Sequence, residues 1–126
     1  MLILDSGAVS RLAERTREMA AFLRALRDEG LWPPTVPSAV LVECLHGHAG
    51  RDAATNRLLK SCDIVEELPA SVARRAAFLR TRARRGSAVD ALVVAHAEPG
   101  ATVLTSDVGD LEALAAYARR VRIERV

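Results

Sequence analysis

Acidic residues occupy several positions in this chain where a carboxylate stands out among apolar neighbours. Four of them follow a short apolar run or lie within an apolar segment: Asp5, Glu43, Asp90 and Asp107. A fifth acid, Asp110, comes three residues after the last of these. Because a carboxylate is rarely buried without a partner, each position requires an explanation.

Each acid, taken alone, has an ordinary structural explanation. Asp5 and Asp107 precede predicted helices, where an aspartate side chain caps free backbone N–H groups. Asp90 lies three residues after Ser87, which is the spacing of a capping box with Asp in place of the usual Glu or Gln. Glu43 would reach solvent from one side of its helix. These structural roles stay open for every residue considered singly.

A convergence of the same acids has a different consequence. Two carboxylates 4 Å apart repel by roughly 4 kcal/mol at an effective dielectric constant near 20. Such a cluster needs a cation or shifted pKa values to persist. Hard oxygen ligands, with no Cys or His at ligand spacing, favour Mg²⁺ or Mn²⁺ over zinc. Carboxylate-held Mg²⁺ suits phosphate chemistry, because one ion can generate the attacking hydroxide and a second can stabilise the leaving oxygen.

Short strands and helices alternate along the chain and must bring these acids together. Apolar runs predict buried strands at Leu2–Leu4 and Thr102–Thr105. Further strands are expected at 35–37, 63–68 and 121–123, the first of them very short because it is rich in proline. Apolar residues at helical spacing predict helices after Asp5, over 16–30, 38–47, 51–61, 69–84 and 88–98, and from Asp107 onward. Ser38 is expected to cap the helix over 38–47, and the helix over 88–98, apolar nearly all round, is expected to be buried.

Strands that alternate with helices predict an α/β fold, with a mainly parallel central sheet covered on both sides. One domain over residues 1–126 is the simplest organisation for a chain of this length. Right-handed crossovers place the carboxyl ends of the strands on one rim of the sheet. Because Asp5 and Asp107 each follow a predicted strand, both are expected on that rim.

The composition is that of a folded protein, since 50% of the residues are hydrophobic and 27% are charged. No apolar run approaches the roughly 20 residues that span a bilayer, and no signal-peptide pattern begins the chain. A cytoplasmic protein without a membrane partner is therefore expected. Cys44 and Cys62 lack metal-ligand spacing and are expected to be reduced thiols.

Four separated motifs resemble those of the PIN-domain family, and most closely the VapC-type toxin ribonucleases of bacterial type II toxin–antitoxin pairs. They extend over nearly the whole chain: Leu2–Gly7 (LILDSG), Val40–Gly47 (VLVECLHG), Asp90–Ala97 (DALVVAHA) and Val103–Leu111 (VLTSDVGDL). The last motif departs from the family at Leu111, where an aromatic residue is frequent.

The resemblance implies a three-layer α/β/α PIN-like fold and a Mg²⁺-dependent endoribonuclease, with Mn²⁺ as a substitute. By position, Asp5, Asp90 and Asp107 resemble the metal ligands of the family. Glu43 resembles a fourth acid that positions metal or water. Asp110 is a second candidate, beside Asp107, for the role of the acid in the last motif, because the motif over Val103–Leu111 varies within the family.

The family also implies partners. These are an RNA substrate, a cognate antitoxin, and a second copy in a homodimer or a hetero-oligomer with the antitoxin. The antitoxin is expected in a groove flanked by the helices predicted over 16–30 and 38–47. Ser6 and Thr105 flank the acids and are expected either to hold a water or phosphate or simply to form caps and turns.

Arginine supplies 17 of the 18 Lys and Arg residues, with Lys60 as the exception, although the net charge is only +2. The planar guanidinium fork suits phosphate groups, but a genome rich in Arg codons would explain the same bias. One cluster precedes the Asp90 helix and is expected either to grip RNA phosphates or to form a solvated helix end. It consists of Arg80, Arg82, Arg84 and Arg85. The aromatic content of 3% argues against base stacking as the main mode of binding.

Two alternatives remain beside the toxin. One is a PIN-fold module that binds RNA or protein without cutting, and the other is a stand-alone RNA-processing nuclease. Two further classes of α/β phosphate chemistry fit poorly. Gly7 stands where a haloacid-dehalogenase phosphatase needs a second aspartate, and Lys60 is misplaced for a response-regulator receiver.

Overall fold

Five short strands form one parallel sheet in the computed structural model, which describes residues 1–126. The strands are β1 (Leu2–Leu4), β2 (Thr35–Pro37), β3 (Asp63–Val65), β4 (Thr102–Thr105) and β5 (Arg122–Arg125). Their order across the sheet is β3-β2-β1-β4-β5, and every neighbouring pair is parallel. The predicted parallel sheet is confirmed, with β1 at its centre.

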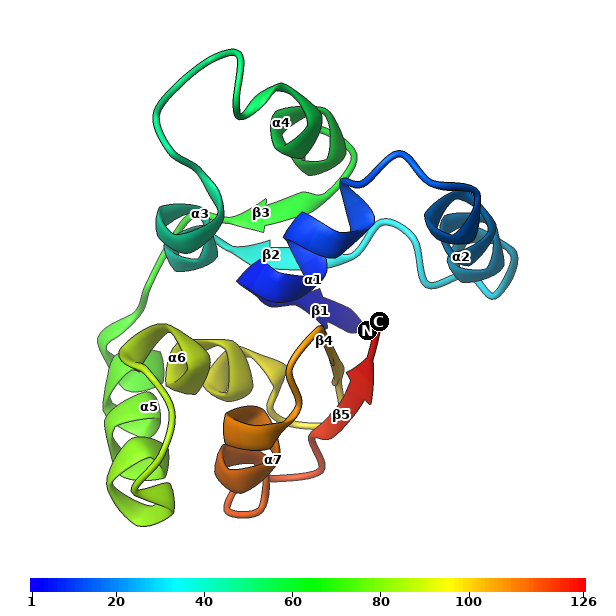
Figure 1. The fold of residues 1–126 in the computed structure, drawn as a ribbon. Coiled ribbons are helices and arrows are strands. Elements are labelled where there is room, and N and C mark those ends of the chain that lie inside the picture. Colours follow the sequence, from blue (N-terminus) through cyan, green and yellow to red (C-terminus); the bar gives the residue numbers. More distant parts are fainter.

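Seven helices cover this sheet in two groups. They are α1 (Ser6–Leu12), α2 (Arg17–Asp28), α3 (Ser38–Cys44), α4 (Ala53–Leu59), α5 (Ala70–Ala83), α6 (Ala88–Ala97) and α7 (Gly109–Ala115). Connections that step in opposite directions along a parallel sheet place their helices on opposite faces. This rule places α1 to α4 on one face and α5 to α7 on the other, which is the predicted α/β/α arrangement. In Figure 1 the first group lies in the upper half of the view, around β1 to β3, and the second group lies in the lower half, beside β4 and β5. None of the helices has the length and apolar character needed to cross a bilayer.

The core forms around β1 and the middle of β4, where apolar side chains lie on both faces of the sheet. Ile3, Leu4 and Val103 are fully or almost fully buried. Helix α6 is buried nearly all round, as its apolar sequence predicts, because it packs against β1, β2, α5 and α7. Leu4 pairs with Leu104, so this rigid centre holds the carboxyl ends of β1 and β4 side by side.

Helix α3 ends at Cys44, three residues before the predicted end, and the loop after it explains why. The buried Asp52 carboxylate accepts hydrogen bonds at 2.9–3.1 Å from three consecutive backbone N–H groups, those of His46, Gly47 and His48. Burial alone would raise the pKa of Asp52, but these bonds hold that pKa below its ordinary value. The carboxylate therefore draws the chain out of helical geometry, and Leu45 already has an extended backbone.

Other predicted boundaries differ as well, among them those of β5, which runs to Arg125 rather than to 123, and of α4, which is shorter than 51–61 at both ends. The residue before Ser38 occupies the cap position of α3, and the Ser38 hydroxyl donates instead to the Glu66 carbonyl at 3.5 Å. Strand β3 stops at Val65, because its partner β2 is itself only three residues long and offers no further backbone groups. Helix α7 begins at Gly109, two residues later than Asp107.

A buried ion pair ties the end of α6 to its neighbours. The Glu98 side chain, only 3% exposed, accepts hydrogen bonds from the Arg75 guanidinium at 2.7 and 2.8 Å. It accepts another from the Arg119 backbone N–H at 2.7 Å. The bonds from Arg75 hold the pKa of Glu98 below its ordinary value, although burial alone would raise it.

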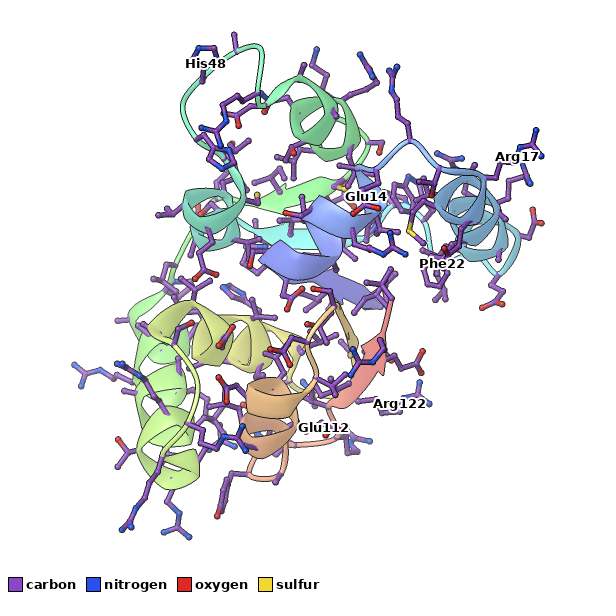
Figure 2. The ribbon with its side chains drawn as sticks, viewed as in Figure 1. Glu14, Arg17, Phe22, His48, Glu112 and Arg122 are labelled. Atoms are coloured by element: carbon purple, nitrogen blue, oxygen red, sulfur yellow. The ribbon has the colours of Figure 1, made fainter.

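We expect Glu98→Ala to lower the free energy of unfolding by about 3 kcal/mol at neutral pH, because Arg75 loses its partly buried partner. A carboxylate with a lowered pKa contributes stability above its unfolded-state value and loses it as the pH falls through the folded-state value. The difference should therefore shrink in acid, which urea unfolding at neutral and acidic pH measures. Glu112→Ala is the control, since Glu112 is exposed on α7 (Figure 2). Equal losses in the two variants would contradict the expectation.

Candidate active site

A pocket of about 250 Å³ opens where β1 and β4 end, and only one of its 11 lining residues is hydrophobic. The lining consists of Asp5, Ser6, Gly7, Glu43, Ser87, Asp90, Thr105, Ser106, Asp107, Asp110 and Leu111. These residues come from the caps and first turns of α1 and α6, from α3, and from the stretch that runs from the end of β4 into α7. All four acids singled out in the sequence, together with Asp110, share this one pocket.

Asp5 is both a helix cap and part of the pocket wall. One carboxylate oxygen accepts a hydrogen bond from the Ala8 backbone N–H at 2.8 Å, and the other accepts from the Thr105 hydroxyl at 2.5 Å. Burial raises the pKa of Asp5 above its ordinary value, in spite of these two bonds. The negative charges of Asp90 and Glu43 raise it further. The acids are therefore close enough to repel one another.

Asp90 enters the pocket from the first turn of α6. The predicted capping box is present: the Ser87 backbone N–H donates to the Asp90 carboxylate, and the Asp90 backbone N–H donates to the Ser87 hydroxyl, both at 3.0 Å. Gly86 makes the turn before it, with a φ of +90°, and a Cβ there would lie 2.7 Å from a methyl group of Leu114. A residue with a side chain at this turn would therefore be strained by the positive φ and would force the buried Leu114 side chain to shift.

Glu43 and the two hydroxyl residues complete the inner wall. The Ser6 hydroxyl donates to the Glu43 carboxylate at 3.3 Å, and Glu43 is otherwise exposed. The Thr105 hydroxyl donates to Asp5 and accepts from the Asp107 backbone N–H at 3.0 Å. Both hydroxyl groups thus bond to acids of the pocket, a contact that differs from the water or phosphate binding and from the caps and turns considered in the sequence.

The two last acids differ in their partners. Asp110 forms an ion pair with the Arg85 guanidinium, with an Nε–Oδ1 distance of 3.0 Å. Asp107 accepts a hydrogen bond from the Gly109 backbone N–H at 3.3 Å and forms no ion pair. Because Asp110 is already balanced by an arginine, Asp107 is the better candidate for the cation-binding role.

The donor set of the pocket fits a hard divalent cation, since carboxylates and hydroxyls are the oxygen ligands that Mg²⁺ and Mn²⁺ prefer. In this structure the acids bind donors of the protein, and no three His, Cys, Asp or Glu side chains lie close enough together to hold an ion. Burial, and to a smaller extent the charges of Asp90 and Glu43, raises the pKa of Asp5, and a cation in the pocket would offset this cost of the charged carboxylate. Ion binding would require the carboxylates to turn inward.

The basic cluster that precedes α6 does not act as one group. Arg85 alone contacts the pocket lining, through Asp110. The Arg82 guanidinium lies over the rings of Phe78 and Tyr117, at 5.9 and 5.7 Å from their centroids. The other two lie elsewhere: Arg84 ends α5 with a φ of 53°, and Arg80 lines an apolar groove between α5 and α6.

Because the four arginines lie apart, we expect substitutions of Arg85 and Arg82 to have different effects. For the RNA substrate that the family resemblance implies, Arg85→Glu should weaken binding about tenfold, because it replaces a cation at the pocket edge with a like charge beside Asp110. Arg82→Glu should change the affinity much less, since Arg82 packs on aromatic rings away from the pocket. Fluorescence anisotropy with a labelled single-stranded RNA, at several salt concentrations, compares the two. If both substitutions weakened RNA binding equally, the four arginines would act together as one basic surface, contrary to this expectation.

The sequence did not single out every residue of the lining. Ser106 and Gly7 meet closely, and a Cβ at Gly7 would lie 2.3 Å from the Ser106 hydroxyl oxygen. A glycine directly after the Asp5–Ser6 turn was the only signal of this close approach. The pairing of Arg85 with Asp110 had no signal, because the two residues are 25 positions apart.

The fold and the pocket define a three-layer α/β protein with a carboxylate site at the rim of its sheet. The chain belongs to the PIN domain family, whose sequence model matches residues 2–117. VapBC2 from Rickettsia felis, in a crystal structure with a DNA fragment from its promoter, is similar in fold. It has a TM-score of 0.70 and 18% identity, covering 99% of this chain and 98% of the other. FitAcB from Neisseria gonorrhoeae has a TM-score of 0.63 and 21% identity, covering 98% and 96%. Comparison with curated proteins gave no significant match.

Proposed function

We propose that this protein is a Mg²⁺-dependent endoribonuclease and the toxin of a type II toxin–antitoxin pair. The observation that carries the proposal is the pocket that Asp5, Glu43, Asp90 and Asp107 share without a cationic partner. Membership of the PIN family, whose members are generally nucleases, supports hydrolysis of a nucleic-acid phosphodiester. The resemblance of the four motifs to VapC-type toxins supports RNA as the nucleic acid.

In the proposed site, Asp5, Asp90 and Asp107 would hold Mg²⁺, with Mn²⁺ as a substitute. When bound, the ion supplies charge neutralisation for the phosphodiester and lowers the pKa of an attacking water. Glu43, which also lines the pocket, would orient that water or complete the ligand set of the ion. Thr105 keeps the Asp5 carboxylate fixed, so that one acid is in place before the others turn inward.

The direct test is cleavage of single-stranded RNA with added Mg²⁺, with Mn²⁺ and with EDTA. We expect cleavage with either ion and none in EDTA, and Mn²⁺ binding with millimolar or better affinity by calorimetry. A protein that binds RNA but neither binds Mn²⁺ nor cuts would be a binding module instead. A single-stranded DNA of the same sequence, run in parallel, tests the choice of RNA.

An antitoxin partner is the second part of the proposal. A groove of about 610 Å³ lies between the end of α1, α2 and α4. Glu14 and Arg17, which Figure 2 labels, belong to its lining. The groove lies beside α2 as the resemblance implies, but it is closed by α4 and includes no residue of α3. Its floor contains Leu12, Leu23 and Leu58, and its edges carry Arg15, Arg17, Arg27 and Arg57. Such a groove suits an acidic segment with an apolar face.

The antitoxin proposal is tested with the protein encoded next to this gene. We expect a small DNA-binding protein that forms a complex with this chain and stops RNA cleavage. Arg17→Glu with Arg57→Glu should weaken that complex while RNA cleavage without the partner continues. A neighbouring gene of unrelated type would favour a stand-alone RNA-processing nuclease. Light scattering on the same samples measures the oligomeric state, which we propose to be a homodimer or a hetero-oligomer with the antitoxin.

A further inference from the structure

The segment that carries Asp107 is held at both ends by arginine side chains. At one end Arg85 pairs with Asp110, at 3.0 Å. At the other end the Arg125 guanidinium donates to the Ser106 carbonyl oxygen, at 2.9 Å. Arg125 is the last residue of β5 and stands in register with Thr105, the last residue of β4. It therefore lies on the same rim of the sheet as the acidic pocket.

The two arginines differ in charge balance. Arg85 is neutralised by Asp110, whereas Arg125 forms no ion pair and is exposed. A guanidinium has five N–H donors, and only one of those on Arg125 has a partner in the protein, a neutral carbonyl. Arg125 is thus an unbalanced cation with free donors, in direct contact with a residue of the pocket lining.

An RNA strand needs such a cation beside this pocket. A metal ion inside the pocket would offset the carboxylates for one phosphate, but the next phosphate along the strand would still meet a negative rim. A planar guanidinium can bind two phosphate oxygens at once, which gives orientation as well as attraction. We propose that Arg125 is a substrate-binding residue that holds an RNA phosphate next to the one in the pocket. The inference rests on the proposed ribonuclease function.

Arg122 provides a matched control on the same strand. It stands opposite Thr102 at the other end of β5, three residues or about 10 Å from Arg125 along the strand. Figure 2 shows it on the outer side of β5, and it lines a different cavity together with Phe22 and Leu26. Removing either arginine changes the net charge equally, so a difference between the two variants depends on position.

The experiment compares wild type, Arg125→Gln, Arg125→Lys and Arg122→Gln. Fluorescence anisotropy with a short labelled single-stranded RNA, in Ca²⁺ buffer at several KCl concentrations, gives affinity and salt slope. Arg125→Gln should lose about tenfold in affinity, and its plot of log K against log[KCl] should be flatter by about 0.7, the share of one phosphate contact on a single strand. Arg125→Lys should keep the slope, because the charge remains, and Arg122→Gln should match wild type.

The outcomes separate the two proposals. If wild type binds and cuts RNA but Arg125→Gln has the wild-type slope, Arg125 only holds the Ser106 segment, and this inference is overturned alone. Equal effects of Arg125→Gln and Arg122→Gln would also overturn it, in favour of general charge attraction. A wild type that neither binds nor cuts RNA overturns the ribonuclease proposal and this inference with it. Thermal melting of each variant shows whether any loss comes from unfolding.

Discussion

Replacing Asp5 with asparagine is expected to abolish RNA cleavage and, at the same time, to stabilise the metal-free protein at neutral pH. The Asp5 carboxylate is buried near Asp90 and Glu43, and its pKa is raised above the ordinary value of 3.8. A group whose folded-state pKa is raised contributes full stability below its unfolded-state pKa and loses it as the pH rises through the folded-state value. At neutral pH the charged form therefore costs stability, and the neutral amide removes that cost.

Asparagine also fits the hydrogen bonds of this position. Its carbonyl oxygen can accept from the Ala8 backbone N–H, as the carboxylate does at 2.8 Å. Its NH₂ group can donate to the Thr105 hydroxyl oxygen. That hydroxyl would then turn its proton from Asp5 to the Asp107 carbonyl oxygen, which already lies 3.0 Å away. No buried donor or acceptor is left without a partner, so the fold should be preserved.

The expected loss of cleavage is more than about 100-fold, since even residues that only support metal ligands contribute about 10- to 100-fold. Melting in EDTA should give a higher Tm for Asp5→Asn than for wild type at neutral pH, and the difference should vanish near pH 4. Added Mg²⁺ should raise the Tm of wild type but not of the variant, because binding to the folded state alone shifts the unfolding equilibrium. Asp63→Asn, at an exposed position that opens β3, is the control. If Asp5→Asn cleaved RNA at the wild-type rate, Asp5 would not be a residue of the catalytic site.

The sequence predicts the centre of this fold better than its edges. Strands β1, β2 and β4 lie where expected, and α5 and α6 lie within about a residue of their predicted ends, because apolar runs and helical spacing report burial directly. The early end of α3 depends on Asp52, which bonds to the backbone several residues before it. The short β3 depends on the length of β2. Contacts of this kind are set by tertiary structure and leave no periodic signal.

The candidate site shows a similar division. The convergence of the acids could be predicted, because the carboxyl ends of parallel strands meet on one rim. In the sequence, each acid could either cap a helix or line a site. In the structure Asp5 and Asp90 do both, because one carboxylate oxygen can cap a helix while the group still faces the pocket. Which arginine reaches the site could not be predicted. Arg85 and Arg125 reach it only through turns and register that the fold determines.

The double role of Asp90 can be separated by a pair of substitutions. Asp90→Asn keeps an oxygen that accepts from the Ser87 backbone N–H, so the cap of α6 survives, but the negative charge is lost. Ser87→Ala keeps the charge of Asp90 but removes the hydroxyl that accepts from the Asp90 backbone N–H. Loss of such a cap costs about 1 kcal/mol of stability, which corresponds to a Tm lower by about 4 °C for a domain of this size.

We therefore expect opposite patterns from the two variants. Asp90→Asn should lose more than about 100-fold in RNA cleavage with a Tm near that of wild type, because a metal ligand is lost while the helix end is kept. Ser87→Ala should melt earlier but lose less than about tenfold in cleavage, because the carboxylate is still present at a more mobile helix end. Initial rates with Mn²⁺ and melting curves in EDTA measure both quantities on the same samples. If Asp90→Asn cut RNA at the wild-type rate, Asp90 would be a helix cap alone, and the cation would have to be held by Asp5, Glu43 and Asp107.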